Sequence, residues 1–464
     1  MNYVSTRGRA PALAFDDVLL AGLARDGGLY VPEAWPGFSA DDIAAMKDLP
    51  YAEIAFRVMQ PFVAPAVNDA DLKAIIAESY AGFDHPEVAP LRYLGTNLWL
   101  MELFHGPTIA FKDYALQFVG RMFDYVLKKR GERVTIVVAT SGDTGSAAIE
   151  ACRGRDTVDI FVLHPKGRVS DVQRRQMTTV NEPNVHNIAV EGTFDDCQNM
   201  VKAMFNDESF RDRINLSAMN SINWARIVSQ IVYYFSAAVR LGAPRRQVSF
   251  AVPTGNFGNV FAGYAAHRSG LDIGRLVVGS NRNDILTRFF ETGRMEMKKV
   301  SPTISPSMDI QISSNFERLL FELYGRDGAR VAETMDEFRE SGKFSVGNNV
   351  LGAAREMFTG GRFDDNKTRA TIKRIYKETG ELLDPHTAVG VAAALGAHLD
   401  ADVPMIALAT AHPAKFPDAV YEATGIAPPL PEALSDLMER EEHCQTLAND
   451  LHAVQAYISE RAQV

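Results

Sequence analysis

The sequence predicts an α/β protein built on a parallel sheet, and two observations lead to this class. Apolar, strand-like runs alternate with helical runs through the middle of the chain, from VTIVVA at Val134–Ala139 to RLVVG at Arg275–Gly279. Glycine-containing turns follow two of these strand-like runs and lead directly into helices. Alternation of this kind favours parallel pairing, because each helix crosses over and brings the next strand alongside the previous one.

Length and composition indicate an ordinary soluble chain of two or three domains. It has 464 residues, 46% of them hydrophobic and 23% charged, and a formal net charge of -10 without a Lys/Arg-rich run. This charge opposes non-specific binding to nucleic acid, and the chain has no run of about 18 apolar residues that would span a membrane. Its three cysteines lie far apart, as is typical of free thiols in a reducing compartment. We therefore expect a cytoplasmic protein with no nucleic-acid partner, no membrane segment and no metal.

Residues 1–90 are predicted to form an N-terminal domain that is mostly helical. Apolar residues recur at helical spacing in DDIAAM, YAEIAFRVMQPF and DADLKAIIAESY, each behind an Asp or Pro start. Before these helices, the Gly27-Gly28 pair forces a bend, and Leu29 to Val31 can form a short strand.

Two α/β domains are predicted after residue 90. The large domain is expected to comprise residues 91–125 and 241–464, and it includes the strand-like LWLMELF. The small domain, residues 126–240, would be inserted into the large one. The final stretch, from Pro428, is predicted to be helical.

The stretch HGPTIAFKDYA places Lys112 among apolar neighbours, directly before an amphipathic helix that ends near Arg130. A lysine in apolar surroundings loses part of its hydration, so its pKa falls and its neutral amine can attack a carbonyl group. Pyridoxal phosphate is the commonest reason for such a lysine. The alternative is an amphipathic lysine at a helix start with Asp113 as its ion partner, and the tripeptide alone favours that interpretation.

The segment PTGNFGN, Pro253–Asn259, lies where an apolar strand ends and a helix begins. Gly255 and Gly258 allow the backbone to turn its N–H groups toward one point, and the helix start adds partial positive charge. Asn256 and Asn259 offer neutral donors, so a phosphate group fits there. A Gly-Asn turn can equally join a strand to a helix without any ligand, and this segment alone leaves both interpretations open.

Two further helix starts carry groups that suit an anion. SGDTG offers the hydroxyl groups of Ser141 and Thr144 and the carboxylate of Asp143, although a simple N-cap explains such a segment in isolation. NSINWAR, Asn220–Arg226, offers an amide, a hydroxyl and a guanidinium group that suit a second phosphate. A helix cap beside an exposed arginine explains that segment equally well.

Two motifs near the C-terminus also lie at element ends. TAHPAKF follows the strand-like PMIALA and offers Thr410, His412 and Lys415 at the carboxyl end of a strand, where open α/β sheets bind ligands. A single histidine is more often structural, and that interpretation is preferred for His412. DPHT, Asp384–Thr387, is expected to begin a helix that runs to Leu399.

Taken together, the motifs closely resemble the bacterial and fungal branch of the threonine synthase family. In chain order they are HGPTIAFKDYA, SGDTG, LHPKGRVSDVQRRQM, NIAVEGTFDDCQ, NSINWARI, PTGNFGN, DPHTAVG and TAHPAKF. The resemblance runs from Ser5 to Phe416. It implies the fold type II of pyridoxal-phosphate enzymes, which is similar to the tryptophan synthase β subunit, with the cofactor between a large and a small α/β domain. It also implies conversion of O-phospho-L-homoserine and water to L-threonine and phosphate, the last step of threonine biosynthesis.

The resemblance further implies roles for individual residues. Lys112 would be the Schiff-base lysine and proton shuttle, and Thr410 would form a hydrogen bond with the pyridine nitrogen of the cofactor. The cofactor phosphate would lie on Gly255, Asn256, Phe257, Gly258 and Asn259. The substrate phosphate would lie on Thr144, Asn220, Ser221 and Arg226, with Ser141 beside them. Asp143 stands where much of the wider fold family has Asn facing the phenolic oxygen of the cofactor, which leaves the protonation state there open.

Other functions stay open at this stage. A related phospho-lyase or dehydratase would use the same lysine and phosphate loop but release a 2-oxo acid. A protein that carries pyridoxal phosphate without turnover is a second alternative, against which the intact Lys112 and Thr410 argue. A generic phosphate-binding module without pyridoxal is the third. The oligomeric state is left open between a monomer and a homodimer.

Overall fold

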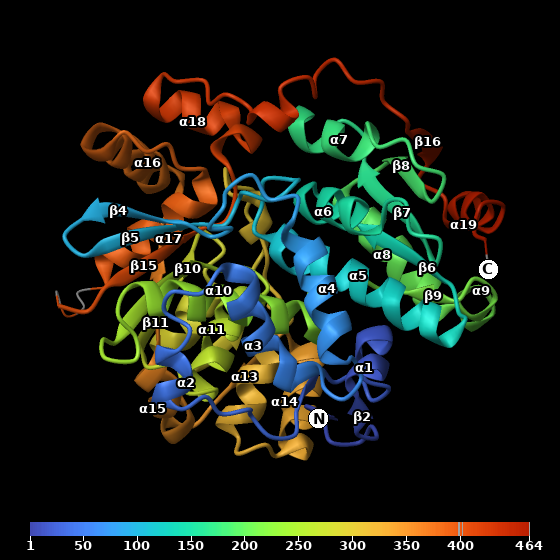
Figure 1. The fold of residues 1–464 in the computed structure, drawn as a ribbon. Helices are drawn as coiled ribbons and strands as arrows, with labels where there is room; N and C mark the ends of the chain where they lie inside the picture. The colour runs from blue at the N-terminus through green and yellow to red at the C-terminus, as the bar shows by residue number, and fades with distance from the viewer. Residues whose placement is uncertain (398–399, 401, 464) are drawn as a thin grey trace.

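The computed structural model describes residues 1–397, 400 and 402–463. Two α/β units lie side by side, and the N-terminal segment covers the lower part of both (Figure 1). One unit is built on a six-stranded sheet and the other on a five-stranded sheet. The predicted α/β class with parallel pairing is confirmed, because most strand pairs in these two sheets are parallel.

The N-terminal segment contains the predicted helices and a small antiparallel sheet in the order β2-β1-β3. Its elements are β1 (Asn2–Ser5), β2 (Leu13–Ala14), α1 (Phe15–Ala21), β3 (Tyr30–Pro32), α2 (Ala40–Ala44), α3 (Tyr51–Val63) and α4 (Asp69–Tyr80). The rings of Tyr3 and Phe62 lie 5.8 and 6.2 Å from the ring of Trp224, which belongs to the centre of the molecule. The segment therefore shares one hydrophobic core with the α/β units.

The larger sheet has the strand order β14-β11-β10-β15-β5-β4, and only the edge pair β4–β5 is antiparallel among its described pairs. Its strands are β4 (Leu91–Gly95), β5 (Leu98–Glu102), β10 (Val248–Pro253), β11 (Ile273–Ser280), β14 (Phe358–Arg362) and β15 (Met405–Ala409). The predicted strands LWLMELF, QVSFAV and PMIALA correspond to β5, β10 and β15. Because β10 and β15 are parallel neighbours, the loops that follow them open at the same edge of the sheet.

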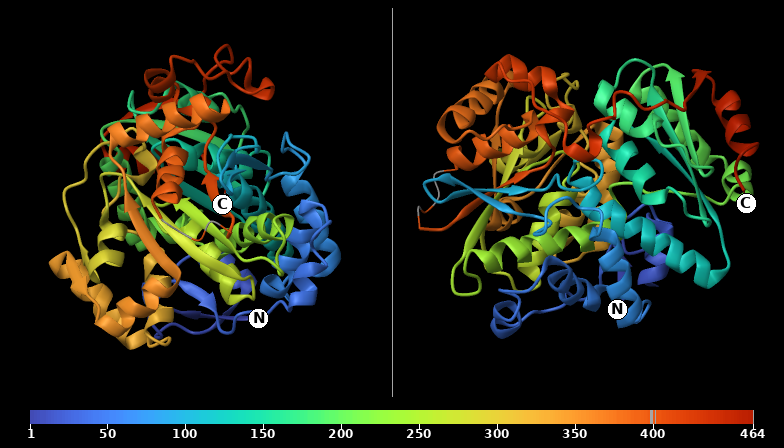
Figure 2. Two further views of the ribbon diagram at one scale, coloured as in Figure 1. Left: turned by 90° about the vertical axis from the view of Figure 1, so that its left-hand side faces the viewer. Right: turned by 45° about the horizontal axis from the view of Figure 1, so that its top comes forward.

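The smaller sheet has the order β16-β8-β7-β6-β9, and all its pairs are parallel. Its strands are β6 (Val134–Ala139), β7 (Val158–Pro165), β8 (Val185–Glu191), β9 (Leu216–Ser217) and β16 (Gln445–Ala448). The prediction that the stretch after Pro428 is helical is wrong for β16. This strand satisfies the backbone groups at the open edge of β8, and α19 (Leu451–Ser459) follows it over the smaller unit (Figure 2).

The domain boundaries need one correction at the C-terminus. The prediction assigned all of 241–464 to the large unit, but β16 adds to the smaller sheet, so the end of the chain returns across the molecule. The other predicted boundaries stay a prediction. The helix expected to run from Asp384 to Leu399 is α17 (Pro385–Gly396), and residues 398 and 399 lie outside the described residues.

The remaining helices pack on the two sheets or on one another. They are α5 (Lys112–Arg130), α6 (Asp143–Cys152), α7 (Asp171–Thr178), α8 (Phe194–Asn206), α9 (Glu208–Arg213), α10 (Trp224–Arg240), α11 (Gly258–Arg268), α12 (Ile285–Thr292), α13 (Phe316–Leu323), α14 (Gly328–Ser341), α15 (Asn348–Met357), α16 (Asp365–Thr379) and α18 (Pro417–Thr424). Short elements are β12 (Arg294–Glu296), β13 (Lys343–Ser345), η1 (Pro306–Met308), η2 (Pro413–Lys415) and η3 (Glu432–Leu434). Within the described ranges, none of the helices has the length and apolar character needed to cross a membrane.

Helices α5 and α6 pack closely where Gly120 faces Ala151. A Cβ atom on Gly120 would lie 2.8 Å from the carbonyl carbon of Ala151 and 2.9 Å from its Cβ, which is nearer than atoms of this kind approach. The absence of a side chain at Gly120 thus sets the distance between two helices that begin at Lys112 and Asp143.

We expect Gly120→Ala to destabilise the protein, because overpacking costs about 1–3 kcal/mol and outweighs the gain of about 0.5–1 kcal/mol from replacing a helical glycine. Gly352→Ala is a matched control, since Gly352 lies in α15 with open space around it and should show only that gain. Chemical denaturation of both variants measures the difference. Equal stability of the two variants would show that the α5–α6 contact tolerates a methyl group.

Candidate active site

Lys112 is the first residue of α5, and its side chain is 11% exposed. Its Nζ donates to Oδ2 of Asp143 at 3.0 Å and lies 5.1 Å from the centre of the Phe111 ring. Burial lowers the pKa of Lys112, the charges of Lys415 and Arg226 lower it further, and Asp143 acts in the opposite direction. The predicted lysine is therefore buried and has a lowered pKa, as a nucleophilic amine requires.

The alternative interpretation, in which Asp113 is the ion partner of Lys112, is wrong. Asp113 instead accepts hydrogen bonds from Thr108, at 2.9 Å from the backbone nitrogen and 2.7 Å from the hydroxyl group. Burial raises the pKa of Asp113 to about 6. Asp113 thus holds the loop before α5, and the ion partner of Lys112 is Asp143.

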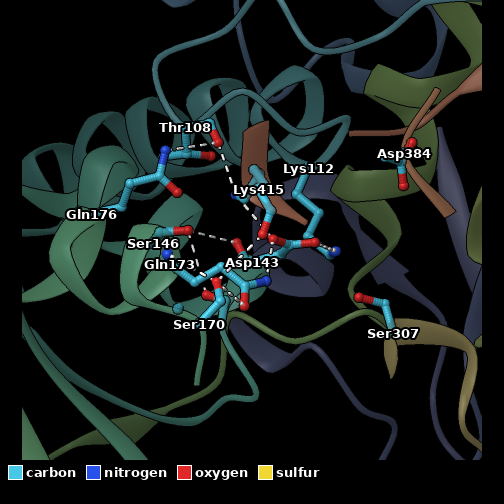
Figure 3. Close-up of polar contacts among 12 residues, drawn as sticks. Thr108, Lys112, Asp143, Ser146, Ser170, Gln173, Gln176, Ser307, Asp384 and Lys415 are labelled. Carbon is cyan, nitrogen blue, oxygen red and sulfur yellow. Dashed lines mark hydrogen bonds and ion pairs between the residues drawn. The ribbon is translucent and has the colours of Figure 1, made fainter. Parts of the chain in front are cut away.

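Asp143 is the first residue of α6, and it holds two lysines (Figure 3). Its Oδ1 accepts from Nζ of Lys415 at 2.9 Å and from Nε2 of Gln173 at 2.8 Å, while Oδ2 accepts from Lys112. Burial opposes ionisation of this carboxyl group, but the charges of Lys112 and Lys415 outweigh it and hold the pKa of Asp143 well below its usual range. The carboxylate is therefore ionised.

Gly142 makes this arrangement possible. Its φ angle is 141°, which favours glycine, and a Cβ atom there would lie 2.7 Å from Nε2 of Gln173. Ser141 and Thr144 lie on either side of Gly142 and Asp143 in the chain. Ser141 is exposed, and Thr144 is half-buried. The SGDTG segment thus does more than cap a helix, since its aspartate lies between two cationic side chains.

The PTGNFGN segment forms the turn between β10 and α11. Phe257 has a φ angle of 63°, and its ring packs 5.2 Å from that of Phe316, so only its backbone faces the turn. Gly255 has no room for a side chain, because a Cβ atom would lie 2.9 Å from the carbonyl oxygen of Ser307. Asn259 accepts from the hydroxyl group of Tyr233 at 2.7 Å, whereas its buried Nδ2 finds no partner among the described residues. The turn thus retains an unused donor and a helix start, both suited to an anion.

Arg226 lies in the first turn of α10 and is 4% exposed. In the described part of the chain, its buried Nε and Nη1 have no hydrogen-bond partner. Burial lowers the pKa of Arg226 to about 10. The alternative of an exposed arginine is wrong, and a buried guanidinium group without an anion is unfavourable.

One side chain joins the loops of the two anion sites. Nδ2 of Asn315 donates to the carbonyl oxygen of Ser221 at 3.1 Å and to that of Asn256 at 2.9 Å. Asn220 is exposed at the start of the same loop, and its Oδ1 accepts from the backbone nitrogen of Ile222 at 3.2 Å. The loop before α10 and the loop before α11 are therefore adjacent.

Thr410 directly follows β15 and is 5% exposed. Its backbone nitrogen donates to Oγ1 of Thr387 at 3.1 Å, and its carbonyl oxygen accepts from the nitrogen of Phe111 at 2.9 Å. Asp384 in turn accepts from the hydroxyl group of Thr387. The DPHT motif thus holds the backbone of Thr410 through hydrogen bonds, and one further backbone hydrogen bond connects Thr410 with Phe111, directly before Lys112.

His412 has the structural role that was preferred for it. Its Nδ1 accepts from the backbone nitrogen of Ala414 at 3.1 Å, and burial lowers its pKa to about 4. Lys415 was named only as part of the TAHPAKF motif, and Gln173 and Asn315 were not predicted, yet all three contact residues of the site. Their sequence signals are weak, because each reaches the site through a contact with a distant segment: Lys415 and Gln173 meet Asp143, and Asn315 meets Ser221.

The fold and the site define a class of enzyme. A buried lysine with a lowered pKa is joined through Phe111 to Thr410 after β15, and the turn after the neighbouring parallel strand β10 begins a helix that suits a phosphate group. Residues 86–340 match the family described as pyridoxal-phosphate dependent enzyme. The chain is a pyridoxal-phosphate-dependent lyase of fold type II.

Further comparisons identify the particular family. Residues 2–80 match the threonine synthase N terminus, and residues 387–458 match the threonine synthase C-terminal family. The chain is 59% identical over 461 residues to the threonine synthase of Pseudomonas aeruginosa, which covers 99% of this chain and 98% of that protein. It is 45% identical over 457 residues to the threonine synthase of Saccharomyces cerevisiae, covering 91% of this chain and 88% of that one.

Solved structures agree with this relationship. The crystal structure of pyridoxal-phosphate-bound threonine synthase from Brucella melitensis has a TM-score of 0.98 at 55% identity and covers 100% of both chains. The yeast threonine synthase structure has a TM-score of 0.94 at 41% identity, covering 99% of this chain and 98% of that one. The chain belongs to the threonine synthase family.

The residues fit the cofactor that this family uses. Lys112 offers an amine with a lowered pKa, and the PTGNFGN turn offers the unused Nδ2 of Asn259 and the start of α11 to a phosphate group. When bound, pyridoxal phosphate supplies an aldehyde that joins the lysine and a ring that withdraws electrons from the substrate.

We expect Arg226→Met to stabilise the cofactor-free protein by about 1–3 kcal/mol, because it removes a buried charge that has no partner. Inorganic phosphate should raise the thermal unfolding temperature of the wild-type protein more than that of the variant. Arg240→Met is the control, since Arg240 lies at the other end of α10 and pairs with Glu87 at 2.8 Å. A larger loss of stability in Arg226→Met than in Arg240→Met would contradict an anion-binding role for Arg226.

Proposed function

We propose that the protein converts O-phospho-L-homoserine and water to L-threonine and phosphate, as the last step of threonine biosynthesis. The observation that carries this proposal is that two buried groups suited to anions, Nδ2 of Asn259 and the Nε and Nη1 donors of Arg226, have no hydrogen-bond partner among the described residues. A phosphorylated cofactor needs one anion site, and a phosphorylated substrate needs another. The PTGNFGN turn suits the first, and the buried Arg226 suits the second.

The proposed cofactor site uses the lysine and the turn after β10. Lys112 would bind the cofactor covalently and then carry protons. Gly255, Asn256, Phe257, Gly258 and Asn259 would hold the cofactor phosphate, and Thr410 would contact the pyridine nitrogen. The position of Thr410 directly after β15 supports this role, since parallel sheets bind ligands at that edge.

The proposed substrate site holds the phosphate group of O-phospho-L-homoserine. Its residues would be Ser141, Thr144, Asn220, Ser221 and Arg226. Arg226 would form charge-assisted hydrogen bonds with the phosphate group. It would also stabilise the negative charge that develops on the phosphate as the phosphate leaves Cγ. The burial of Arg226 supports this role, because electrostatic attraction is stronger where water is excluded.

The reaction requires several proton transfers at neighbouring carbons. Protons leave Cα and Cβ of the substrate, phosphate departs from Cγ, a proton adds at Cγ, water adds at Cβ, and a proton returns to Cα. A lysine amine with a lowered pKa can both accept and return a proton near neutral pH. Thr410 would offer the ring nitrogen a neutral hydroxyl group in place of a carboxylate, which moderates the electron demand of the ring.

A product assay separates this reaction from the phospho-lyase alternative. Purified protein with pyridoxal phosphate and O-phospho-L-homoserine should form threonine and phosphate in equal amounts, and Lys112→Ala should form neither. Borohydride reduction should attach the cofactor to Lys112 in the wild-type protein. If 2-oxobutyrate were the main product, the protein would be a lyase, and attachment at another lysine would remove Lys112 from its role.

We predict that Thr410→Ala keeps the cofactor bound but lowers kcat at least about tenfold, or about 1.4 kcal/mol of transition-state stabilisation. Thr410→Ser keeps the hydroxyl group and should retain much more activity. Steady-state kinetics and the visible spectrum of each variant measure these effects. Threonine formation by Thr410→Ala at the wild-type rate, with full cofactor occupancy, would leave Thr410 as a packing residue.

We further propose that the enzyme acts in the cytoplasm on this small-molecule substrate, as a monomer or a homodimer. The three cysteines, Cys152, Cys197 and Cys444, are free thiols, which supports a reducing compartment.

A further inference from the structure

Lys415 is a fully buried lysine whose ammonium group is bonded to Asp143, the partner of Lys112, and to the loop before Lys112. It is 0% exposed, and its Nζ donates to Oδ1 of Asp143 at 2.9 Å and to the carbonyl oxygen of Thr108 at 2.8 Å. A buried ammonium group is costly unless it is paired, and these two acceptors provide the pairing. Figure 3 shows Lys415 and Lys112 directed toward the same carboxylate.

Two lysines at one carboxylate leave an excess of positive charge. Asp143 can balance only one of them, so the second is easier to deprotonate than a lysine with its own counter-ion. Lys112 is the one that must become neutral to react, and it keeps 11% of its side-chain surface exposed, whereas Lys415 has none. Lys415 is also held by Thr108, while the other contact of Lys112 is the ring of Phe111.

We propose that Lys415 is a positioning residue of the active site: its ammonium group is the permanent counter-ion of Asp143, and this frees Lys112 to become neutral and react. The inference rests on the proposed role of Lys112. It also explains how an ionised aspartate is accommodated where an asparagine is common in the wider fold family. The negative charge of Asp143 remains compensated by Lys415 when Lys112 loses its proton and becomes neutral.

The charged groups around Lys112 and Lys415 come from four elements. Lys112 and Asp113 belong to α5, Asp143 begins α6, Arg226 lies on α10, and Lys415 ends η2. Lys415 and Arg226 both lower the pKa of Lys112, and Asp143 raises it. Lys415 also lowers the pKa of Asp113, which burial raises. Removing the charge of Lys415 should therefore raise the pKa of Lys112, and removing the charge of Asp143 should lower it.

The experiment measures the protonation of Lys112 in the cofactor-free protein. Trace acetylation with acetic anhydride across a pH series, quantified at the Lys112 peptide by mass spectrometry, follows the neutral amine. Lys415→Met and Lys415→Gln should both move the pH midpoint upward and slow acetylation at neutral pH by about tenfold. The glutamine variant keeps a donor for Thr108, so it separates loss of charge from loss of a hydrogen bond.

Four further variants make the test specific to charge. Asp143→Asn should move the midpoint downward, and the double variant Asp143→Asn with Lys415→Met should bring it back toward the wild-type value. Lys415→Arg keeps the charge and should leave the midpoint in place. Lys128→Met, at the exposed end of α5, is the surface control and should cause no shift.

An unchanged midpoint in both Lys415→Met and Lys415→Gln would overturn the proposal, as would shifts in the same direction for Asp143→Asn and Lys415→Met. The wild-type product assay tests the reaction independently. Threonine formation by the wild-type protein together with an unchanged Lys112 midpoint in the variants would refute the role of Lys415 and leave the proposed function intact. An inactive wild-type protein with the expected shifts would refute the proposed function and support the role of Lys415.

Discussion

The buried carboxylate of Asp143 is the constraint on which the site depends. A buried charge is unfavourable by several kcal/mol unless it is paired and hydrogen-bonded, and Asp143 meets this requirement with two lysines and Gln173. The start of α6 adds partial positive charge from the helix dipole. The same interactions hold Lys112 in a place where burial lowers its pKa, although the charge of Asp143 itself raises that pKa.

The fold brings these groups together from segments that are far apart in the chain. Lys112 and Asp143 begin neighbouring helices, whose separation is set by the contact of Gly120 with Ala151. Lys415 comes from the segment after β15, more than 250 positions later in the chain. Because β10 and β15 are parallel neighbours, the PTGNFGN turn and the TAHPAKF segment open at the same sheet edge. The Asn315 side chain then joins the loops of the two anion sites.

Much of this arrangement could be predicted from the sequence, because its signals are local. The apolar run VTIVVA predicted β6 with its observed bounds, and the apolar residues before Lys112 suggested a buried amine, although they left the amphipathic alternative favoured until the other motifs were considered. The Gly-Asn turn predicted an anion site but could not distinguish it from a ligand-free connection.

The missed features depend on long-range contacts that leave little trace in the local sequence. The strand β16 is four residues long in a polar stretch, and it forms because β8 offers an open edge. Arg226 could be taken for a surface arginine, since only the tertiary fold buries it. Likewise, Asp113 follows Lys112 in the chain, yet it pairs with Thr108, and Asp143 takes the lysine.

A crystal structure of this protein with pyridoxal phosphate bound would test the central claim most directly. The claim is that Lys415 compensates the charge of Asp143 independently of Lys112. We predict that Nζ of Lys415 stays within hydrogen-bond distance of a carboxylate oxygen of Asp143, at about 2.7–3.2 Å, while Lys112 is bound to the cofactor. A structure in which Lys415 points away from Asp143, or in which another cation takes its place, would contradict this account.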